Sequence, residues 1–199
     1  MRRLSISGSG RQSDNLGAGA PIQVAYSYNT TTGSKVFSSR STYESVPGTL
    51  RCNLVRGNAN SNFVVRAHLY WGGYNASIDV APLFRVFWGT TASTCDNTLG
   101  PLWQGGHNGS NVSVTSGANA GYYRYGRGDN NASTEVEYLL TAGGVPNVGS
   151  GASIYFEVKW AAGYEAGSRT LYWNRGINTG NAYNPIHTCG MTVTEVSPV

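Results

Sequence analysis

The sequence has little charge for its length. Asp, Glu, Lys and Arg together make up 12% of its 199 residues, against roughly 25% in average soluble domains. Only two of the 14 cations are lysines. A helical bundle needs charged faces to keep its helices soluble, so this composition argues against one. No run of apolar residues approaches the roughly 18 that a membrane-spanning helix needs, which excludes that class as well.

Cysteine is also scarce, and its number is odd. Three cysteines cannot form a disulfide framework of the kind that holds small secreted domains together. The first residues are basic but lack the apolar segment of a secretion signal. We therefore expect a protein made in a reducing cytosol, with free thiols at Cys52, Cys95 and Cys189.

Glycine and aromatic residues are plentiful. The chain has 27 Gly, 13 Tyr and 5 Trp, and small polar residues rather than charges provide its solubility. Apolar residues alternate with polar ones at period two, which is typical of half-buried strands. The clearest cases are 62–71 and 154–160, and further patterns lie at 22–29, 36–43, 50–54, 83–88, 112–114, 135–140, 170–173 and 191–194. Eight to ten short strands predict an all-β sandwich or barrel.

Residues 1–20 differ from the rest and predict an extended amino-terminal arm before a single β-domain at 21–199. The arm is rich in Gly and Ser, and its basic and apolar anchors are Arg2, Arg3, Leu4, Ile6 and Arg11. Two interpretations stay open. The arm binds a partner surface, or it is a solvated terminus. The chain lacks basic runs and nucleic-acid-binding motifs, so we expect no nucleic-acid partner.

Residues 89–134 predict long loops with one short strand around Val112 and Val114. Their aromatic residues form a possible surface-recognition loop: Trp103, Tyr122, Tyr123 and Tyr125. Rigid aromatic rings among Asn, Ser and Gly are typical of surfaces that bind proteins or sugars. The alternative is that these rings only pack over the open end of the sandwich.

Two residue pairs could carry chemistry. His187 and Cys189 would lie on one strand face, as a nucleophile and its base would. Glu135 and Glu137 also share a face, at a spacing that a glycosidase pair could use. We favour the structural interpretation for both: an edge histidine beside a buried thiol, and a solvated strand face. The sequence thus predicts no catalytic residue, no metal and no cofactor.

Several segments together resemble the jelly-roll domains of tailed-bacteriophage virion proteins, those of cyanophages especially. The segments are 24–28 (VAYSY), 39–50 (SRSTYESVPGTL), 60–67 (NSNFVVRA), 167–175 (GSRTLYWNR) and 191–196 (MTVTEV). The resemblance covers about residues 22–197. It implies a jelly-roll-type β-sandwich with a structural or adhesive role, and it favours a homotrimer.

The resemblance leads to two expectations for function. The short arm and single domain fit a capsid decoration (cement) protein that binds the major capsid protein on the capsid exterior and stabilises the shell. The alternative is a receptor-binding tip of a tail or head fibre that adheres to a host-surface glycan or protein. A carbohydrate-active or lectin-like module is a third hypothesis.

Overall fold

The structure is a computed structural model that describes residues 3–4, 19–37, 43–74, 82–98, 101–105, 130–145, 147–162, 169–175 and 187–198. Antiparallel β-strands make up almost all of the regular secondary structure in these ranges. One 3₁₀ turn, Ala142–Gly144, lies between two of the strands. No helix in these ranges could cross a membrane. The strands are β1 (Arg3–Leu4), β2 (Pro21–Asn29), β3 (Gly33–Phe37), β4 (Glu44–Val55), β5 (Asn62–Tyr74), β6 (Pro82–Gly89), β7 (Asn97–Thr98), β8 (Pro101–Gly105), β9 (Asn130–Leu140), β10 (Ser153–Ala162), β11 (Arg169–Trp173) and β12 (Cys189–Val196).

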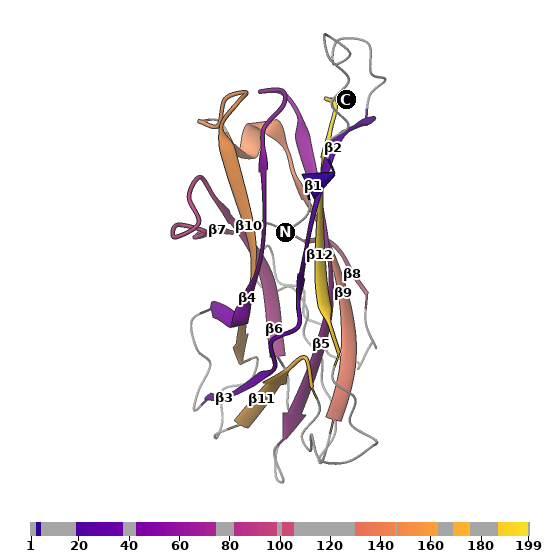
Figure 1. Ribbon diagram of the computed structural model, residues 1–199, viewed down its shortest axis with the longest axis vertical. Coiled ribbons are helices and arrows are strands. Elements are labelled where there is room, and N and C mark those ends of the chain that lie inside the picture. Colours follow the sequence, from indigo (N-terminus) through magenta and orange to yellow (C-terminus); the bar gives the residue numbers. More distant parts are fainter. Residues whose placement is uncertain are drawn as a thin grey trace.

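The strands form two sheets that lie side by side as layers (Figure 1). The smaller sheet has the order β4-β10-β6-β7. The larger sheet is built on β2-β12-β5-β9. Strand β1 is added beside β2 and β8 beside β9, while β11 and β3 continue the sheet from the end of β5.

The pairing of these strands is nested. Early strands pair with late ones in four steps: β2 with β12, β4 with β10, β5 with β9, and β6 with β7. This is the pattern of one long antiparallel hairpin rolled up into two sheets, which is the jelly roll. The predicted jelly-roll-type sandwich is therefore confirmed.

The core between the sheets is rich in large aromatic side chains. On β5 and β10 the large apolar residues of the alternating face are buried, from Phe63 to Trp71 and from Ile154 to Trp160. Glu157, on the opposite face of β10, is buried as well. At one end of the core, aromatic rings from the two sheets contact each other. Trp173 lies 6.2 Å from Trp160 and 6.1 Å from Phe84 between ring centroids. These contacts join the two sheets directly.

The large apolar residues of β2 lie on the outer face of the sheet rather than in the core. Val24, Tyr26 and Tyr28 alternate as a core face would, yet Ala25 and Asn29 are the buried residues of the strand. Strand β4 contacts β2 from the opposite sheet, and the buried positions of β2 hold the small residues Ala25 and Asn29. The tyrosines therefore lie on the outer face of the larger sheet.

The prediction of long loops over 89–134 is wrong in part. Residues 101–105 form β8, and β9 begins at Asn130, before the alternation at Glu135. Asn is a poor strand former, but backbone pairing between β9 and the Gly72–Gly73 end of β5 extends the strand. The expected strand around Val112 and Val114 lies outside the described residues.

Two fully buried charged residues, Glu195 and Arg56, hold the loops at the end of the sandwich where β12 ends. The Glu195 carboxylate accepts hydrogen bonds from three loop residues and from Gln23. The Arg56 guanidinium donates to four loop carbonyls. Burial lowers the pKa of Arg56, and the nearby Glu195 charge opposes that effect. The carbonyl oxygens that accept from Arg56 belong to Asn58, Ser61, Val145 and Val148.

Residues 19 and 20 are hydrogen-bonded to Ser197, near the other end of the described chain. The Gly19 amide donates to the Ser197 carbonyl at 3.3 Å, and the Ser197 amide donates to the Ala20 carbonyl at 2.8 Å. The Ser197 hydroxyl also accepts from the Ala20 amide. Residues 19 and 20 thus belong to the folded domain by their hydrogen bonds.

Candidate functional site

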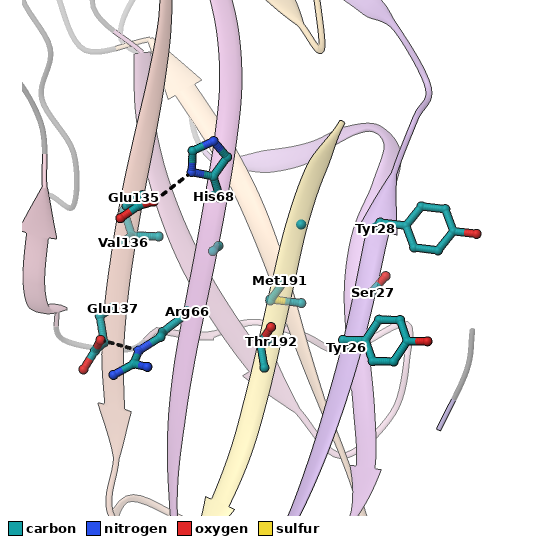
Figure 2. A pocket seen from close by; sticks show the side chains of 12 residues that line it. Tyr26, Ser27, Tyr28, Arg66, His68, Glu135, Val136, Glu137, Met191 and Thr192 are labelled. Atoms are coloured by element: carbon teal, nitrogen blue, oxygen red, sulfur yellow. Dashed lines mark hydrogen bonds and ion pairs between the residues drawn. The ribbon is translucent and has the colours of Figure 1, made fainter. Parts of the chain in front are cut away.

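A hollow of about 720 Å³ lies on the outer face of the larger sheet, which we call the outer-face hollow (Figure 2). It spans β2, β12, β5 and β9. Twelve residues line it: Tyr26, Ser27, Tyr28, Arg66, Ala67, His68, Glu135, Val136, Glu137, Gly190, Met191 and Thr192. Its volume lies within the range of small-ligand sites.

Strand register aligns its outward residues in two parallel rows. One row runs across the sheet as Tyr26, Thr192, Arg66 and Glu137, and the other as Tyr28, Gly190, His68 and Glu135. Such neighbours on adjacent strands lie roughly 4.5 to 5.5 Å apart and interact directly. The site is therefore a product of pairing four strands that are far apart in the sequence.

Gly190 makes the hollow. It stands between Tyr28 and His68 in the second row, where any other residue would place a side chain. Apart from its two chain neighbours, the nearest described atom to a Cβ at this position would be the Ser27 carbonyl oxygen, at 3.9 Å. The position between Tyr28 of β2 and His68 of β5 thus carries no side chain.

Two ion pairs lie on the β5–β9 side of the hollow (Figure 2). His68 Nδ1 lies 3.0 Å from Glu135 Oε1, and Arg66 Nε donates to Glu137 Oε2 at 2.6 Å. The hydrogen bond to Glu137 raises the pKa of Arg66. The Arg66 side chain is 69% exposed and that of Glu135 is 64% exposed. Such exposed pairs add little stability, but they hold polar groups at the rim of the hollow.

Aromatic side chains of β2 and β5 lie near the hollow. Tyr28 is 64% exposed, an unusual position for a large side chain, and Figure 2 shows it projecting from β2 beside Tyr26. On β5, Tyr70 packs edge-on against His68 at 4.9 Å between centroids. Tyr70 also stacks on His187, with the ring centroids 3.9 Å apart and the planes 6° from parallel. His68 is thus held between Glu135 and Tyr70.

The residues singled out from the sequence reach different places. Glu135 and Glu137 share one face, as predicted, and each pairs with a cation or imidazole of β5. Trp103 belongs to strand β8 rather than to a loop, and its backbone lies opposite Glu137. The backbone of Arg3 and Leu4 forms β1 against Val24 and Ala25. The other predicted arm and loop residues lie outside the described ranges: Arg2, Ile6, Arg11, Tyr122, Tyr123 and Tyr125.

Sequence reasoning missed the centre of the hollow. Tyr26 and Tyr28 fall in the predicted strand pattern at 22–29, and Arg66 and His68 fall in that at 62–71. Neither pattern indicates that these residues come together on one face. One signal was available: a strand that alternates large apolar residues with Gln23, Ala25 and Asn29. Which face turned outward could not be read from that pattern alone, because alternation fixes the period and not the direction.

His187 and Cys189 do not form a nucleophile–base pair in the structure. The imidazole stacks on the Tyr70 ring, whereas the Cys189 thiol accepts a hydrogen bond from the Tyr70 amide at 3.0 Å. Burial raises the pKa of Cys189 to about 12. A thiol that stays protonated is a poor nucleophile. The geometry agrees with the structural interpretation of this pair.

The three cysteines are free, as predicted, and all three are buried. Burial raises the pKa of Cys52 and Cys189 to about 12 and also raises that of Cys95. We expect the folded protein to resist iodoacetamide at pH 8 and the guanidinium-unfolded chain to be alkylated at all three thiols, as counted by intact mass. Rapid labelling of the folded chain would contradict the buried assignment.

The same thiols predict a loss of stability at alkaline pH. In the unfolded chain a thiol ionises near pH 9, whereas folded Cys52 and Cys189 stay protonated up to about pH 12. Because only the unfolded state gains the charged form between these values, the free energy of unfolding falls as pH rises through that interval. Urea titrations from pH 8 to 10.5 measure this. In Cys52→Ala and Cys189→Ala the decline should be shallower.

Among the described residues no group of three or more His, Cys, Asp or Glu side chains could hold a metal ion. The sequence matches no protein-family model and no curated protein. One similar solved structure is that of infectious bursal disease virus, Gx strain, with 11% identity and a TM-score of 0.33. The match covers 98% of this chain but 45% of that one. A likeness at this level does not establish a common fold, so the fold assignment rests on the strand pairing.

Proposed function

We propose that this protein is a virion structural protein, a capsid decoration protein that binds the exterior of a viral shell. The observation that carries the proposal is the nested jelly-roll pairing of β2 to β12, because it is the fold that the sequence resemblance to phage virion proteins implies. Jelly rolls also occur in lectins and cupins, so the fold alone does not decide the function. The resemblance over residues 22–197 favours a virion protein over a lectin or a cupin.

The described part of the arm supports this role. Gly19 lies next to Ser197, and Arg3 and Leu4 pair with only two residues of β2. Most of that edge of β2 has no strand paired to it among the described residues. An exposed edge can accept a further strand from a neighbouring molecule. Attachment through an arm at a sheet edge, repeated over many copies, would give tight binding from weak contacts.

Imaging of virions tests the proposal. Cryo-electron microscopy of particles from the virus that encodes this chain should show jelly-roll density on the outside of the capsid, in a trimeric arrangement if the oligomer expectation is correct. A matched particle lacking the gene should lose that density and become less heat-stable. Capsids without the density would overturn the decoration role, whereas density at a fibre end would support adhesion instead.

Removal of residues 1–18 should separate attachment from folding. The cut keeps the hydrogen bonds of Gly19 and Ala20 to Ser197. Among the described residues, the strand pairing that it removes is the two-residue pairing of β1. We expect the unfolding free energy to change by less than about 1 kcal/mol, while co-sedimentation with undecorated capsids is lost. Full occupancy of the shell by the truncated chain would show that the arm is not the attachment segment.

Host-surface adhesion is a second candidate function, favoured by the outer-face hollow. An exposed tyrosine beside an open glycine position and two ion pairs is a surface that can take a ligand. The test is competition: the purified chain at saturating concentration should block adsorption of virions to host cells if it serves as the receptor-binding part. Unchanged adsorption would argue against this candidate.

A further inference from the structure

One edge of the larger sheet is only partly covered. Strand β2 pairs with β12 along its whole length, from Pro21 to Asn29. Its other side, which we call the β2 edge, pairs with β1 at two residues, Val24 and Ala25. No other strand in the described part of the chain lies on that side. The β2 edge therefore keeps backbone groups that can bind a strand, and β1 shows that a segment of this chain fits it in the antiparallel direction.

Two tyrosine rings extend over the β2 edge. Figure 2 shows Tyr26 and Tyr28 projecting from β2 on the side away from β12, which is the side on which β1 pairs. Tyr28 is 64% exposed, the highest value among the exposed large apolar residues of the described chain. A strand that binds along this edge would contact the rings as well as the backbone. Burial of the rings would add apolar stabilisation to the backbone hydrogen bonds.

The connection between β1 and β2 is long enough to reach another copy of the chain. Fourteen residues, 5–18, separate Leu4 from Gly19, and the Gly19 amide is hydrogen-bonded to Ser197 just before β2 begins. Common β-hairpin connections have about two to five residues, which forces the two strands of one chain to pair. A connection of this length spans at most about 50 Å, roughly ten strand spacings. The β2 edge of a neighbouring copy is therefore within reach of Leu4.

Pairing within one chain has little advantage over pairing between copies. The contact between β1 and β2 consists of two residues on each strand, and such short two-stranded contacts are marginally stable by themselves. Closing a long connection also costs more entropy than closing a short one. Exchange between copies makes the same backbone contacts with an identical partner. In an assembled oligomer each exchanged contact is reinforced by the others, because the neighbouring edge is held nearby.

We propose that β1 of one copy pairs with the β2 edge of the next copy, so that the amino-terminal segments are exchanged around a closed oligomer. Each copy gives one segment and accepts one, and such head-to-tail contacts close into a ring when a rotation relates the copies. The trimer expected from the sequence resemblance is a ring of this kind. The partner at the β2 edge is thus a second copy of this chain. The inference requires neither a shell nor a receptor, so its failure is distinguishable from failure of either function proposed above.

Disulfide trapping tests the exchange. Leu4 and Val24 are Cα partners in the pairing of β1 with β2, and such partners lie roughly 4.5 to 5.5 Å apart, within the range of a disulfide. The full-length variants Leu4→Cys and Val24→Cys are refolded together from guanidinium under reducing conditions and then oxidised. We expect a disulfide-linked dimer whose digest contains a peptide pair joining positions 4 and 24, because that bond can form only between copies. The native thiols are buried and should not compete.

The double variant Leu4→Cys/Val24→Cys gives the decisive comparison. Exchange should yield covalent oligomers, trimers among them, on non-reducing gels. A monomer with an internal disulfide as the only product overturns the proposal, and so does an unmodified chain that sediments as a monomer at every concentration. Leu4→Cys mixed with Tyr155→Cys is the matched control, since Tyr155 is a partly exposed residue of the other sheet. A control link as abundant as the link between positions 4 and 24 would indicate random collision and would also overturn the proposal.

Sedimentation of a truncated chain supplies a test without new cysteines. Removal of residues 1–18 takes away β1 and keeps the hydrogen bonds of Gly19 and Ala20 to Ser197. We expect the dissociation constant of the oligomer to rise at least about tenfold, because every exchanged contact is lost at once. Circular dichroism establishes that the truncated chain is folded. An unchanged dissociation constant overturns the proposal, since the oligomer then forms without the exchange.

Discussion

Replacement of Glu195 by alanine is expected to cost about 3 to 5 kcal/mol of unfolding free energy, a typical penalty for breaking a buried charge network. The Glu195 side chain is fully buried. Its carboxylate accepts from the amides of Gly57 and Asn58 at 2.9 and 3.1 Å and from the Ser61 hydroxyl. Alanine would leave these donors unpaired in the interior, and each unpaired donor costs about 1 to 3 kcal/mol.

The loss would extend to Arg56, the buried cation of the same cluster. Its guanidinium donates to carbonyl oxygens of two loops, so it depends on the positions that Glu195 fixes. Chemical denaturation followed by far-ultraviolet circular dichroism measures the effect. Glu195→Gln should fall between alanine and the native residue, because one amide oxygen still accepts hydrogen bonds.

Glu137→Gln is the matched control for Glu195. It removes an acidic group that pairs with an arginine on the surface, where the Arg66 side chain is largely exposed. Exposed pairs contribute about 0 to 1 kcal/mol, so the control should change stability little. A cost below about 1 kcal/mol for Glu195→Ala would contradict the assigned role, since it would mean that water or rearranged loops satisfy the same donors.

Trp173→Ala should also cost about 3 to 5 kcal/mol, through the cavity that it opens in the core. The Trp173 ring is fully buried and contacts Phe84 and Trp160 of the opposite sheet. Its removal withdraws the contact surface that joins the two layers at that end. Because whole domains are stable by only about 5 to 15 kcal/mol, the variant should be close to its unfolding threshold at 37 °C.

Circular dichroism suits this measurement better than fluorescence, because the substitution removes one of the five tryptophans. Tyr28→Ala is the control: it deletes a comparably large ring from an exposed position, and we expect a change below about 0.5 kcal/mol. A similar cost for both substitutions would show that the loss comes from strand propensity rather than from core packing.

The fold could be predicted where alternation and burial agree. On β5 and β10 the large residues of the alternating face lie in the core. The predicted period of alternation and the predicted direction of the buried face are therefore both correct for these strands. The jelly-roll order itself came from the resemblance, since alternation within a strand says nothing about which strands pair. β8 was missed because its five residues, from Pro101 to Gly105, include one proline and one glycine and are too few to show a period.

The candidate site was harder to predict because it exists only after four strands pair. Tyr28, His68 and Glu135 are separated by dozens of residues, and register alone aligns them. The burial of Glu195 could not be predicted from the sequence either. A glutamate among Thr and Val on the last strand predicts a solvated position, and its burial depends on loop amides that the sequence pattern does not reveal.

The nested pairing has a consequence for how the protein is made. Strand β12 lies between β2 and β5 in the larger sheet, yet it is the last of the three to be synthesised. Until it arrives, the ribosome-bound chain holds two facing sheet edges with no strand between them, and the contact between Gln23 and Glu195 waits for 172 further residues. Contacts of such high sequence separation slow folding. Premature release would leave open edges prone to aggregation.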